Sequence, residues 1–277
     1  MDLPREYISY SQVRLYQTCP RKYYYVYIKN LAVPINDKIF LGVVFHKVIE
    51  EYFKKKIESA EPTVERSGEM FNRTFESLQN NQPINWENTI QETRRRGNAF
   101  VSYFVRKVAP AIKPLMVEKE LWADLPGLDI KLKGVLDLVE TDFSITDFKT
   151  TTAKWSKSRI KNTYLQVVIY RYLFEQSFGD VISRLQFKII YAKNTAPIKS
   201  QEISIKPKDV DFNYAKMLDI IAYVVNNIKQ GVFYKNENYF CGFCEYKDRC
   251  RSGEEPECEP SAPATVTPET NGRNPLN

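Results

Sequence analysis

Hydrophobic residues recur with two different periods along this chain. In its middle and later parts, short runs alternate or are continuously apolar and end at turn residues, which is typical of β-strands. The predicted strands are 114–125, 129–142, 143–152, 183–193 and 202–207. Other stretches carry apolar residues every three or four positions, as on one face of a helix. The predicted helices are 12–19, 42–58, 89–108, 158–178 and 209–231.

Strands flanked by helices predict an α/β fold. The strands 129–142 and 143–152 are expected to form a hairpin through Thr141 and Asp142. Residues 60–114 are predicted to be mostly helical. The tyrosine-rich run at 21–31 fits a half-buried strand and a half-buried helix equally well. Its tyrosines, lysines and arginine could also form a surface for single-stranded nucleic acid.

The composition is that of a globular protein, with 43% hydrophobic and 13% aromatic residues in 277. No apolar run approaches the ~20 residues of a membrane helix. The first ten residues lack the apolar stretch of a signal peptide, so we expect a cytoplasmic protein with no membrane partner. In that compartment five cysteines are not expected to form a disulfide framework. A single histidine excludes zinc sites built from histidine pairs.

The charge is divided unevenly along the chain. The net charge is +6, but residues 251–277 contain two arginines, five glutamates and five of the 15 prolines. We expect this acidic tail to be disordered and residues 1–250 to form a single domain, which is more basic than the total suggests. A basic body modestly favours a phosphate-bearing partner. The arginines at 94–96 are typical of a solvated helix face, with a phosphate contact as the alternative.

Two aspartates and a lysine form the first candidate site. Asp137 interrupts an apolar strand, whereas Asp147 and Lys149 are two residues apart and therefore share a strand face. Two carboxylates directed at one point repel each other unless a divalent cation lies between them. Such a cation can activate water for attack on a phosphate, with the lysine assisting. A buried ion pair between Asp147 and Lys149 is the simpler explanation of these two residues alone.

Three further polar residues accompany this site. His46 lies on a predicted helix with an apolar face, where a histidine is usually a core residue, but its imidazole could be a third metal ligand that suits manganese better than calcium. Gln166 and Tyr170 share one helical face, as an ordinary hydrogen-bonding pair would. Glu118 and Glu120 precede the site on a predicted strand and are secondary candidates.

Cysteines form the second candidate site. Cys241, Cys244 and Cys250 are closely spaced, while Cys19 lies more than 200 residues earlier and Cys258 falls in the tail. A ligand set of one distant cysteine and three closely spaced ones suits a [4Fe–4S] cluster, with zinc as the alternative. Either metal would join the two ends of the folded body, and a purely structural role for it remains open.

These motifs, in this order, resemble the PD-(D/E)XK nuclease superfamily and its RecB-type branch. The quoted set is Gly42-x3-His46, Gly134-x2-Asp137, Asp147-x-Lys149 and Gln166-x3-Tyr170, followed by the cysteines. Among iron–sulfur members, the chain resembles the CRISPR-associated exonucleases of the Cas4 type and AddB-type nuclease domains. The resemblance implies a restriction-endonuclease-like core, a central mixed sheet flanked by helices, with an added helical region at about 60–114 and a C-terminal iron–sulfur segment.

The resemblance also implies a role for each residue. His46, Asp137, Asp147 and the carbonyl of Phe148 would hold Mg²⁺ or Mn²⁺. Lys149 would be the catalytic lysine, and Gln166 and Tyr170 would support the site and the DNA strand. The ligands of the [4Fe–4S] cluster would be Cys19, Cys241, Cys244 and Cys250.

The function expected from this resemblance is metal-dependent hydrolysis of DNA. We expect an exonuclease on single-stranded DNA or DNA ends, in DNA repair, recombination or CRISPR adaptation, with helicase, nuclease or CRISPR-adaptation proteins as partners. The alternative is a non-catalytic iron–sulfur DNA-binding subunit of such a complex. A third hypothesis is a nucleic-acid-binding protein in which the cysteines hold a structural zinc ion.

Overall fold

The computed structural model describes residues 2–32, 34–81, 83–179, 182–193, 196–206 and 213–252. They divide into two compact units. Of the described residues, the terminal unit takes 2–32, 122–134 and 213–252, and the central unit takes 34–81, 83–121, 135–179, 182–193 and 196–206. The tail predicted at 251–277, with Cys258, lies outside the described residues apart from Arg251 and Ser252.

A mixed sheet forms the basis of the central unit. Its strands are β4 (Pro114–Asp124), β5 (Lys131–Glu140), β6 (Ile145–Thr151), β7 (Leu185–Tyr191) and β8 (Lys199–Ile205), the first two of which continue into the terminal unit. β5 pairs with β4 and with β6. The β5–β6 and β7–β8 pairs are antiparallel, whereas β6 and β7 are parallel. A mixed sheet with flanking helices confirms the predicted α/β class.

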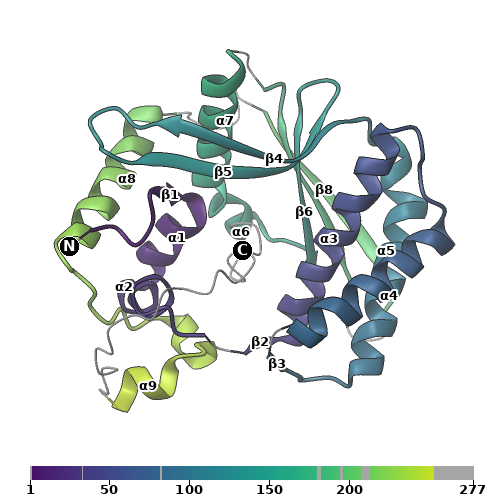
Figure 1. Cartoon of the computed structure of the whole chain (residues 1–277), viewed down its shortest axis with the longest axis horizontal. Coiled ribbons are helices and arrows are strands. Elements are labelled where there is room, and N and C mark those ends of the chain that lie inside the picture. The colour runs from purple at the N-terminus through teal and green to yellow at the C-terminus, as the bar shows by residue number, and fades with distance from the viewer. Residues whose placement is uncertain are drawn as a thin grey trace. The chain divides into compact units, whose positions relative to one another are not determined.

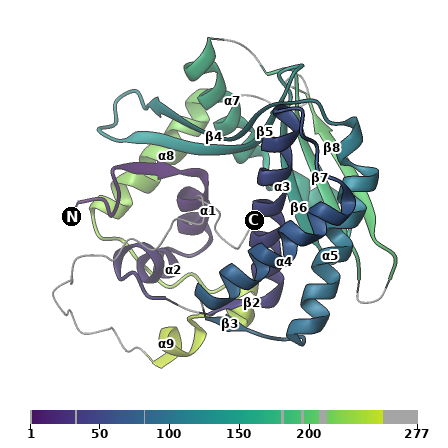
Figure 2. The same cartoon turned by 45° about the vertical axis from the view of Figure 1, so that its right-hand side comes forward.

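Three helices cover one face of this sheet, as Figures 1 and 2 show. They are α3 (Asp37–Ile57), α4 (Val64–Asn81) and α5 (Ile90–Lys107), with a short 3₁₀ turn η2 (Ala109–Ala111) after them. Two two-residue strands, β2 (Ile35–Asn36) and β3 (Ile84–Asn85), pair in parallel beside them. Rings from α3 and α5, Phe53 and Phe104, pack on Phe148 of β6 at centroid distances of 5.7 and 5.4 Å. The core of the unit therefore lies between these helices and β6.

Local sequence explains where the helices of this layer begin. α3 begins at Asp37, five residues before the predicted start, because the side chain of Asn36 accepts a hydrogen bond from the backbone of Ile39 at 2.9 Å. α5 begins with a capping box in which Thr89 and Glu92 satisfy each other's backbone N–H groups. Side-chain caps of this kind satisfy helix N–H groups that have no partner within the helix.

A helix on the connection from β6 to β7 was predicted as one element over 158–178. The structure divides it into α6 (Lys157–Lys161) and α7 (Tyr164–Phe178). α7 ends at Gly179, whose φ of +66° is the left-handed conformation that favours glycine. A parallel strand pair requires a crossover of this length, so the β6–β7 pairing explains why helices stand here.

Helices dominate the terminal unit, and β1 (Tyr7–Ser9) pairs in parallel with the first residues of β5. Its helical elements are α1 (Tyr10–Thr18), α2 (Pro20–Tyr23), a π-helical turn η1 (Tyr24–Ile28), α8 (Tyr214–Lys229), a 3₁₀ turn η4 (Tyr239–Phe243) and α9 (Lys247–Ser252). The tyrosine-rich run is thus helical rather than extended. The Tyr23 ring stacks on Phe233, which follows α8, with 6° between the ring planes. None of the described helices is long and apolar enough to cross a bilayer.

Candidate metal and catalytic centre

The two aspartates of the first candidate site lie where β5 and β6 separate. The antiparallel register pairs Val139 with Ile145 and Leu138 with Thr146, and its continuation places Asp137 opposite Asp147. The backbone pairing of β5 and β6 ends before these two aspartates. Beyond it, the side-chain carboxylate of Asp137 accepts a hydrogen bond from the backbone N–H of Phe148 at 3.0 Å. Both backbone groups of a strand residue face the same neighbouring strand, so the Phe148 carbonyl points to this side as well.

His46 from α3 and Glu118 from β4 complete a group of three metal-binding side chains around Asp137. One ligand atom from each residue lies within 4.8 Å of the other two. The Nδ1 atom of His46 is 3.3 Å from Oδ2 of Asp137, and both side chains are largely buried. Each of these residues comes from a different element, so the group exists only in the folded chain. The predicted proximity of His46 and Asp137 is therefore present.

Glu118 joins this group through an unusual backbone conformation. Its φ is +46°, a left-handed value that is uncommon for a residue other than glycine. The alternation of inward and outward side chains along β4 is interrupted at this residue, because residues 116–118 are all half-buried, whereas buried and exposed positions alternate regularly from 121 onward. A local irregularity of this kind can redirect one side chain in a strand. Glu120, the other secondary candidate, is exposed.

Asp147 and Lys149 form an ion pair on β6, with Nζ 3.0 Å from Oδ2. The other carboxylate oxygen of Asp147 accepts a hydrogen bond at 3.0 Å from the side-chain amide of Gln166 on α7. Asp147 and Gln166 are both buried. Tyr170 lies one helical turn beyond Gln166 and is half-buried. The predicted neighbourhood of Asp147, Lys149 and Gln166 is therefore present, although Asp147 is outside the three-residue group.

The donor atoms fit a divalent cation of the Mg²⁺ or Mn²⁺ type. Two carboxylate oxygens are the ligands that such hard cations prefer, and an imidazole nitrogen is well tolerated by manganese. Two nearby carboxylates also leave an excess of negative charge, which a cation would balance. His46, Glu118 and Asp137 can therefore hold a metal, with the ammonium group of Lys149 on the neighbouring strand.

The arginines at 94–96 are divided between solvent and packing contacts, and Arg95 is exposed as the predicted solvated face requires. Arg94 pairs with Glu76 at 3.0 Å and lies over the Phe75 ring. Arg96 donates to the backbone carbonyl of Ala192 and lies over its own helix neighbour Phe100, and its burial lowers the pKa of the guanidinium. Two of the three arginines therefore make packing contacts within the central unit, which neither a freely solvated face nor a phosphate site would require.

All four predicted cluster cysteines lie in the terminal unit and are free, half-buried thiols. Cys19 directly precedes α2, and Cys241 lies in η4. Cys244 directly follows η4, and Cys250 lies in α9. Burial raises the pKa of the Cys244 thiol, the cation of Lys22 opposes this shift, and the charge of Cys19 adds to it. Cys19 and Cys244 are therefore electrostatic neighbours despite their separation in sequence.

Asparagine side chains hold these cysteine segments together. The amides of Asn236 and Asn238 both donate to the carbonyl of Thr18 at 3.0 Å. Lys22 pairs with Glu245 at 2.5 Å. Among the described residues, no three cysteines bring their sulfur atoms within 4.8 Å of one another.

The chain belongs to the PD-(D/E)XK nuclease superfamily, whose sequence profile matches residues 7–251. This match confirms the family that the motif order indicated and supports a hydrolytic nuclease. Members of the superfamily use divalent metals, in agreement with the donor group around Asp137.

A solved structure with the same fold is that of "Putative exonuclease" from Eubacterium rectale. It is 13% identical in sequence and matches 92% of this chain and 91% of its own, with a TM-score of 0.59. At this identity the likeness shows a shared fold. Recyclin-1 of Saccharomyces cerevisiae is 31% identical over 81 residues, which is 29% of this chain but 9% of the yeast protein. That short segment says nothing about the activity of this chain.

Proposed function

We propose that this protein is a metal-dependent deoxyribonuclease of the RecB-type branch, an exonuclease on single-stranded DNA or DNA ends. The observation that carries the proposal is the juxtaposition of His46, Glu118 and Asp137 with the Asp147–Lys149 pair across two diverging strands. An ion pair alone would explain Asp147 and Lys149. It would not explain why the carboxylates of Glu118 and Asp137 and the imidazole of His46 lie together. The exonuclease name of the neighbour from E. rectale agrees with the proposed mode of action.

In this proposal, His46, Glu118 and Asp137 would hold Mg²⁺ or Mn²⁺, with Asp147 and the Phe148 carbonyl as further ligands. When bound, such a cation supplies a more acidic water and stabilises the negative charge that develops on the phosphate. The chain's own contribution is to fix the ligands in place. The Phe148 N–H orients Asp137, and the Gln166 amide orients Asp147.

Lys149 is the residue that we assign to the chemistry itself. Its ammonium group is 3.0 Å from Asp147 and only 13% exposed, so its charge acts in a poorly screened environment. There it can position the attacking water by hydrogen bonding and offset charge on the phosphate. Tyr170 and Gln166 would then support the DNA strand beside it.

A basic segment directly after β6 provides contacts for a phosphate backbone. Residues 154–161 contain Lys154, Lys157, Arg159 and Lys161 and no acidic residue. All four side chains belong to exposed residues, and Arg159 lies over the Trp155 ring at 4.7 Å. Because the segment continues the strand that carries Asp147 and Lys149, it suits a polyanionic substrate of the same site.

For the terminal unit we propose that Cys19, Cys241, Cys244 and Cys250 bind a [4Fe–4S] cluster. The supporting observations are four free, half-buried thiols in the terminal unit and the hydrogen bonds from Asn236 and Asn238 to Thr18, which hold the segment of Cys19 against the segment of Cys241. The cluster would join residue 19 to residues 241–250 and thereby complete one nuclease domain over residues 1–250. Work in DNA repair, recombination or CRISPR adaptation, with partners from those systems, is consistent with this assignment.

A cleavage assay with two matched lysine variants tests the proposal. Lys149 and Lys188 both lie on central strands, are 13% and 11% exposed, and pair with a carboxylate at 3.0 and 2.9 Å. Lys188 is aligned with Phe148 rather than with Lys149, so it points to the opposite face of the sheet. End-labelled single- and double-stranded DNA is incubated with each anaerobically purified protein in Mn²⁺, Mg²⁺ or chelator.

The wild-type protein and Lys188→Met should degrade DNA in Mn²⁺ or Mg²⁺ but not in chelator. Lys149→Met should be at least about 100-fold slower, which is the usual contribution of a group that transfers or positions a proton. Circular dichroism verifies the fold of both variants. DNA binding without any metal-dependent product would favour the non-catalytic alternative. Equal rates for Lys149→Met and wild type would refute the role of Lys149.

A further inference from the structure

The terminal unit exposes aromatic rings in an unusual pattern. Its strongly exposed large hydrophobic residues are Trp122, Tyr223, Tyr234, Tyr239, Phe240 and Phe243. Among the described residues of this unit, no leucine, isoleucine or methionine is exposed to a comparable degree. Flat aromatic rings offer stacking surfaces for planar ligands such as nucleic-acid bases.

Three of these rings form one cluster on η4, which we call the ring cluster: Tyr239, Phe240 and Phe243. They are 81%, 55% and 76% exposed. The Tyr239 ring lies 5.9 Å from each of the other two. Exposing three large rings together is costly in water, so a ligand that covers them would gain their burial.

The backbone beneath the ring cluster is well fixed. The Asn238 side chain accepts a hydrogen bond from the backbone of Phe240 at 2.9 Å, while its amide reaches the carbonyl of Thr18 at 3.0 Å. The backbone N–H of Cys241 also bonds to the carbonyl of Asn238 at 3.0 Å. The rings are therefore held on a rigid support, which lowers the entropy cost of binding to them.

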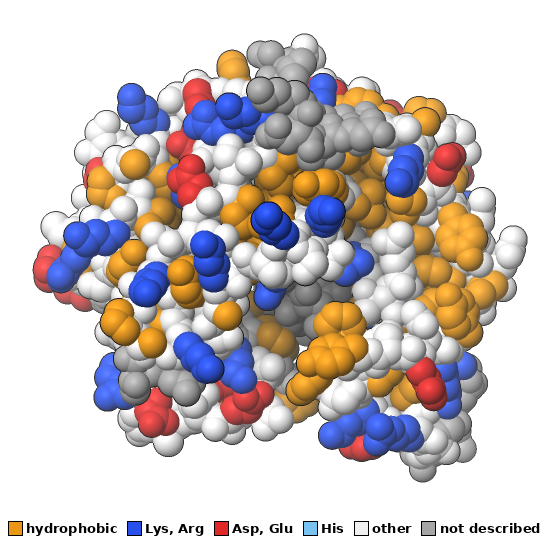
Figure 3. All heavy atoms as spheres, turned by 180° about the vertical axis from the view of Figure 1, so that it is seen from behind, with side chains coloured by type: hydrophobic (Ala, Val, Ile, Leu, Met, Phe, Trp, Pro, Cys, Tyr) orange, Lys and Arg blue, Asp and Glu red, His pale blue; other side chains and the backbone are white. Residues whose placement is uncertain are grey.

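Positive charge accompanies the rings in the same unit. The segment 10–32 contains Arg14, Arg21, Lys22 and Lys29 and no acidic residue. Lys22 is paired with Glu245. α9, which packs against η4, adds Lys247, Arg249 and Arg251 against the single carboxylate of Asp248, all exposed, so its charge is net positive. Figure 3 shows one face of the molecule on which hydrophobic side chains reach the surface beside lysine and arginine groups.

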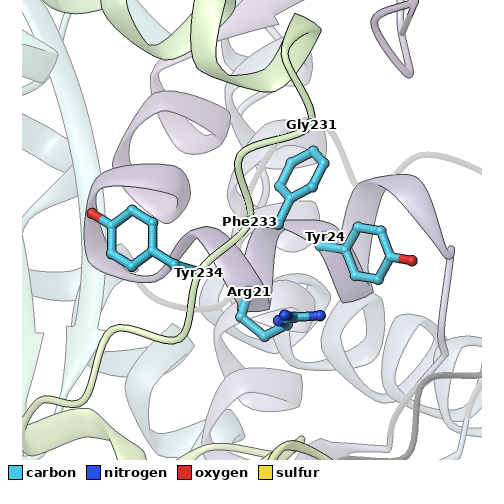
Figure 4. A pocket seen from close by; sticks show the side chains of 5 residues that line it. All are labelled: Arg21, Tyr24, Gly231, Phe233 and Tyr234. Atoms are coloured by element: carbon cyan, nitrogen blue, oxygen red, sulfur yellow. The ribbon is translucent and has the colours of Figure 1, made fainter.

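A pocket of about 380 Å³ in the terminal unit repeats this combination. It is lined by Arg21, Tyr24, Gly231, Phe233 and Tyr234, and Figure 4 shows the Arg21 guanidinium on the same side as the Tyr24 ring. The guanidinium carbon of Arg21 is 5.7 Å from the centre of the Tyr24 ring. The centres of the Tyr24 and Phe233 rings are 5.1 Å apart. A cation over one aromatic ring, with a second ring beside that ring, suits one nucleotide, whose phosphate is negative and whose base is flat.

We propose that the terminal unit binds single-stranded DNA by stacking bases on the ring cluster of Tyr239, Phe240 and Phe243. The proposal rests on the proposed function for the identity of the ligand, because a nuclease supplies DNA as the strand to be held. Duplex DNA keeps its bases stacked on one another, so the rings would favour single strands. The central unit would cleave the strand, while the terminal unit would give affinity that depends on the presence of bases.

Binding of labelled oligonucleotides tests the role of the ring cluster. Full-length protein is titrated, in chelator to prevent cleavage, into fluorescein-labelled oligo(dT) and into an abasic oligonucleotide of equal length. The double variant Tyr239→Ala/Phe243→Ala removes two rings. Tyr223→Ala, which removes an exposed ring from α8 in the same unit, is the matched control.

We expect the double variant to bind oligo(dT) roughly 5- to 160-fold more weakly for each base that loses its ring, with abasic affinity unchanged. The control should bind both ligands as the wild type does. Phe243→Trp keeps a ring at this position, so this variant should retain the wild-type affinity for oligo(dT). Bound oligo(dT) should quench the fluorescence of the new tryptophan. This variant also decides the question if the alanine variants do not fold.

Other outcomes would overturn the inference. Equal binding of oligo(dT) and the abasic strand by the wild type would show that bases are not contacted. Unchanged oligo(dT) binding by the double variant, with loss of a dimer in light scattering, would make the ring cluster a contact between two copies. If the wild type cleaves DNA and the ring variants bind normally, only this inference fails. If nothing is cleaved but binding depends on the rings, only the proposed nuclease activity fails.

Discussion

Glu118 connects backbone strain with metal binding, so one substitution there should change stability and metal affinity in different directions. A left-handed backbone at a residue other than glycine costs roughly 1–2 kcal/mol, and the φ of Glu118 is +46°. Glu118→Gly would relieve this strain, while glycine's greater freedom in the unfolded chain would cost about 0.5–1 kcal/mol. The net change in unfolding free energy should lie between roughly zero and a gain of 1.5 kcal/mol.

The same substitution removes one of the carboxylates in the three-residue metal group. Loss of groups that only orient metal ligands already costs about 10- to 100-fold in affinity, so loss of a ligand should cost at least about 10-fold. Glu118→Gln should lose metal affinity without the gain in stability, because it keeps the strained backbone. Isothermal titration with Mn²⁺ measures affinity, and denaturant unfolding in chelator measures stability.

Glu120 is the matched control for both measurements, since it is exposed and lies two residues further along β4. Glu120→Gln should leave Mn²⁺ affinity unchanged. Glu120→Gly should lower stability by about 0.5–1 kcal/mol, as glycine does in an ordinary strand. If Glu118→Gly binds Mn²⁺ as the wild type does, Glu118 is not a ligand. If it destabilises as much as Glu120→Gly, strain at residue 118 does not limit stability.

Two further predictions concern helix packing and DNA binding. Gly97→Ala should destabilise by about 1–3 kcal/mol despite a better helix propensity, because the added Cβ would lie 2.1 Å from the Phe71 ring. Gly68→Ala, whose Cβ would meet its nearest neighbour at 3.5 Å, should stabilise by about 0.5–1 kcal/mol, and equal effects in thermal unfolding would contradict this reasoning. The variant Lys157→Gln/Lys161→Gln should reduce the salt slope of single-strand binding by about 1.4, for two lost phosphate contacts, and an unchanged slope would exclude the basic segment from the DNA path.

The sequence alone determined the elements and the motif order, because both depend on local properties. Hydrophobic periodicity depends on which face of an element is buried, and it predicted the strands around Asp137 and Asp147 and the helix that carries His46. The same-face placement of Asp147 and Lys149 follows from the two-residue period of a strand. These features require no knowledge of distant parts of the chain.

Only the tertiary structure decided which residues meet. The role of Glu118 depends on a left-handed residue in β4 that the strand alternation did not predict. The break between α6 and α7 and the packing of Arg94 and Arg96 likewise depend on neighbours far along the chain. Gly68 and Gly97 illustrate the physical reason most simply. Both are helical glycines in the sequence, but the space beside each is set by a different helix, and no local pattern contains that information.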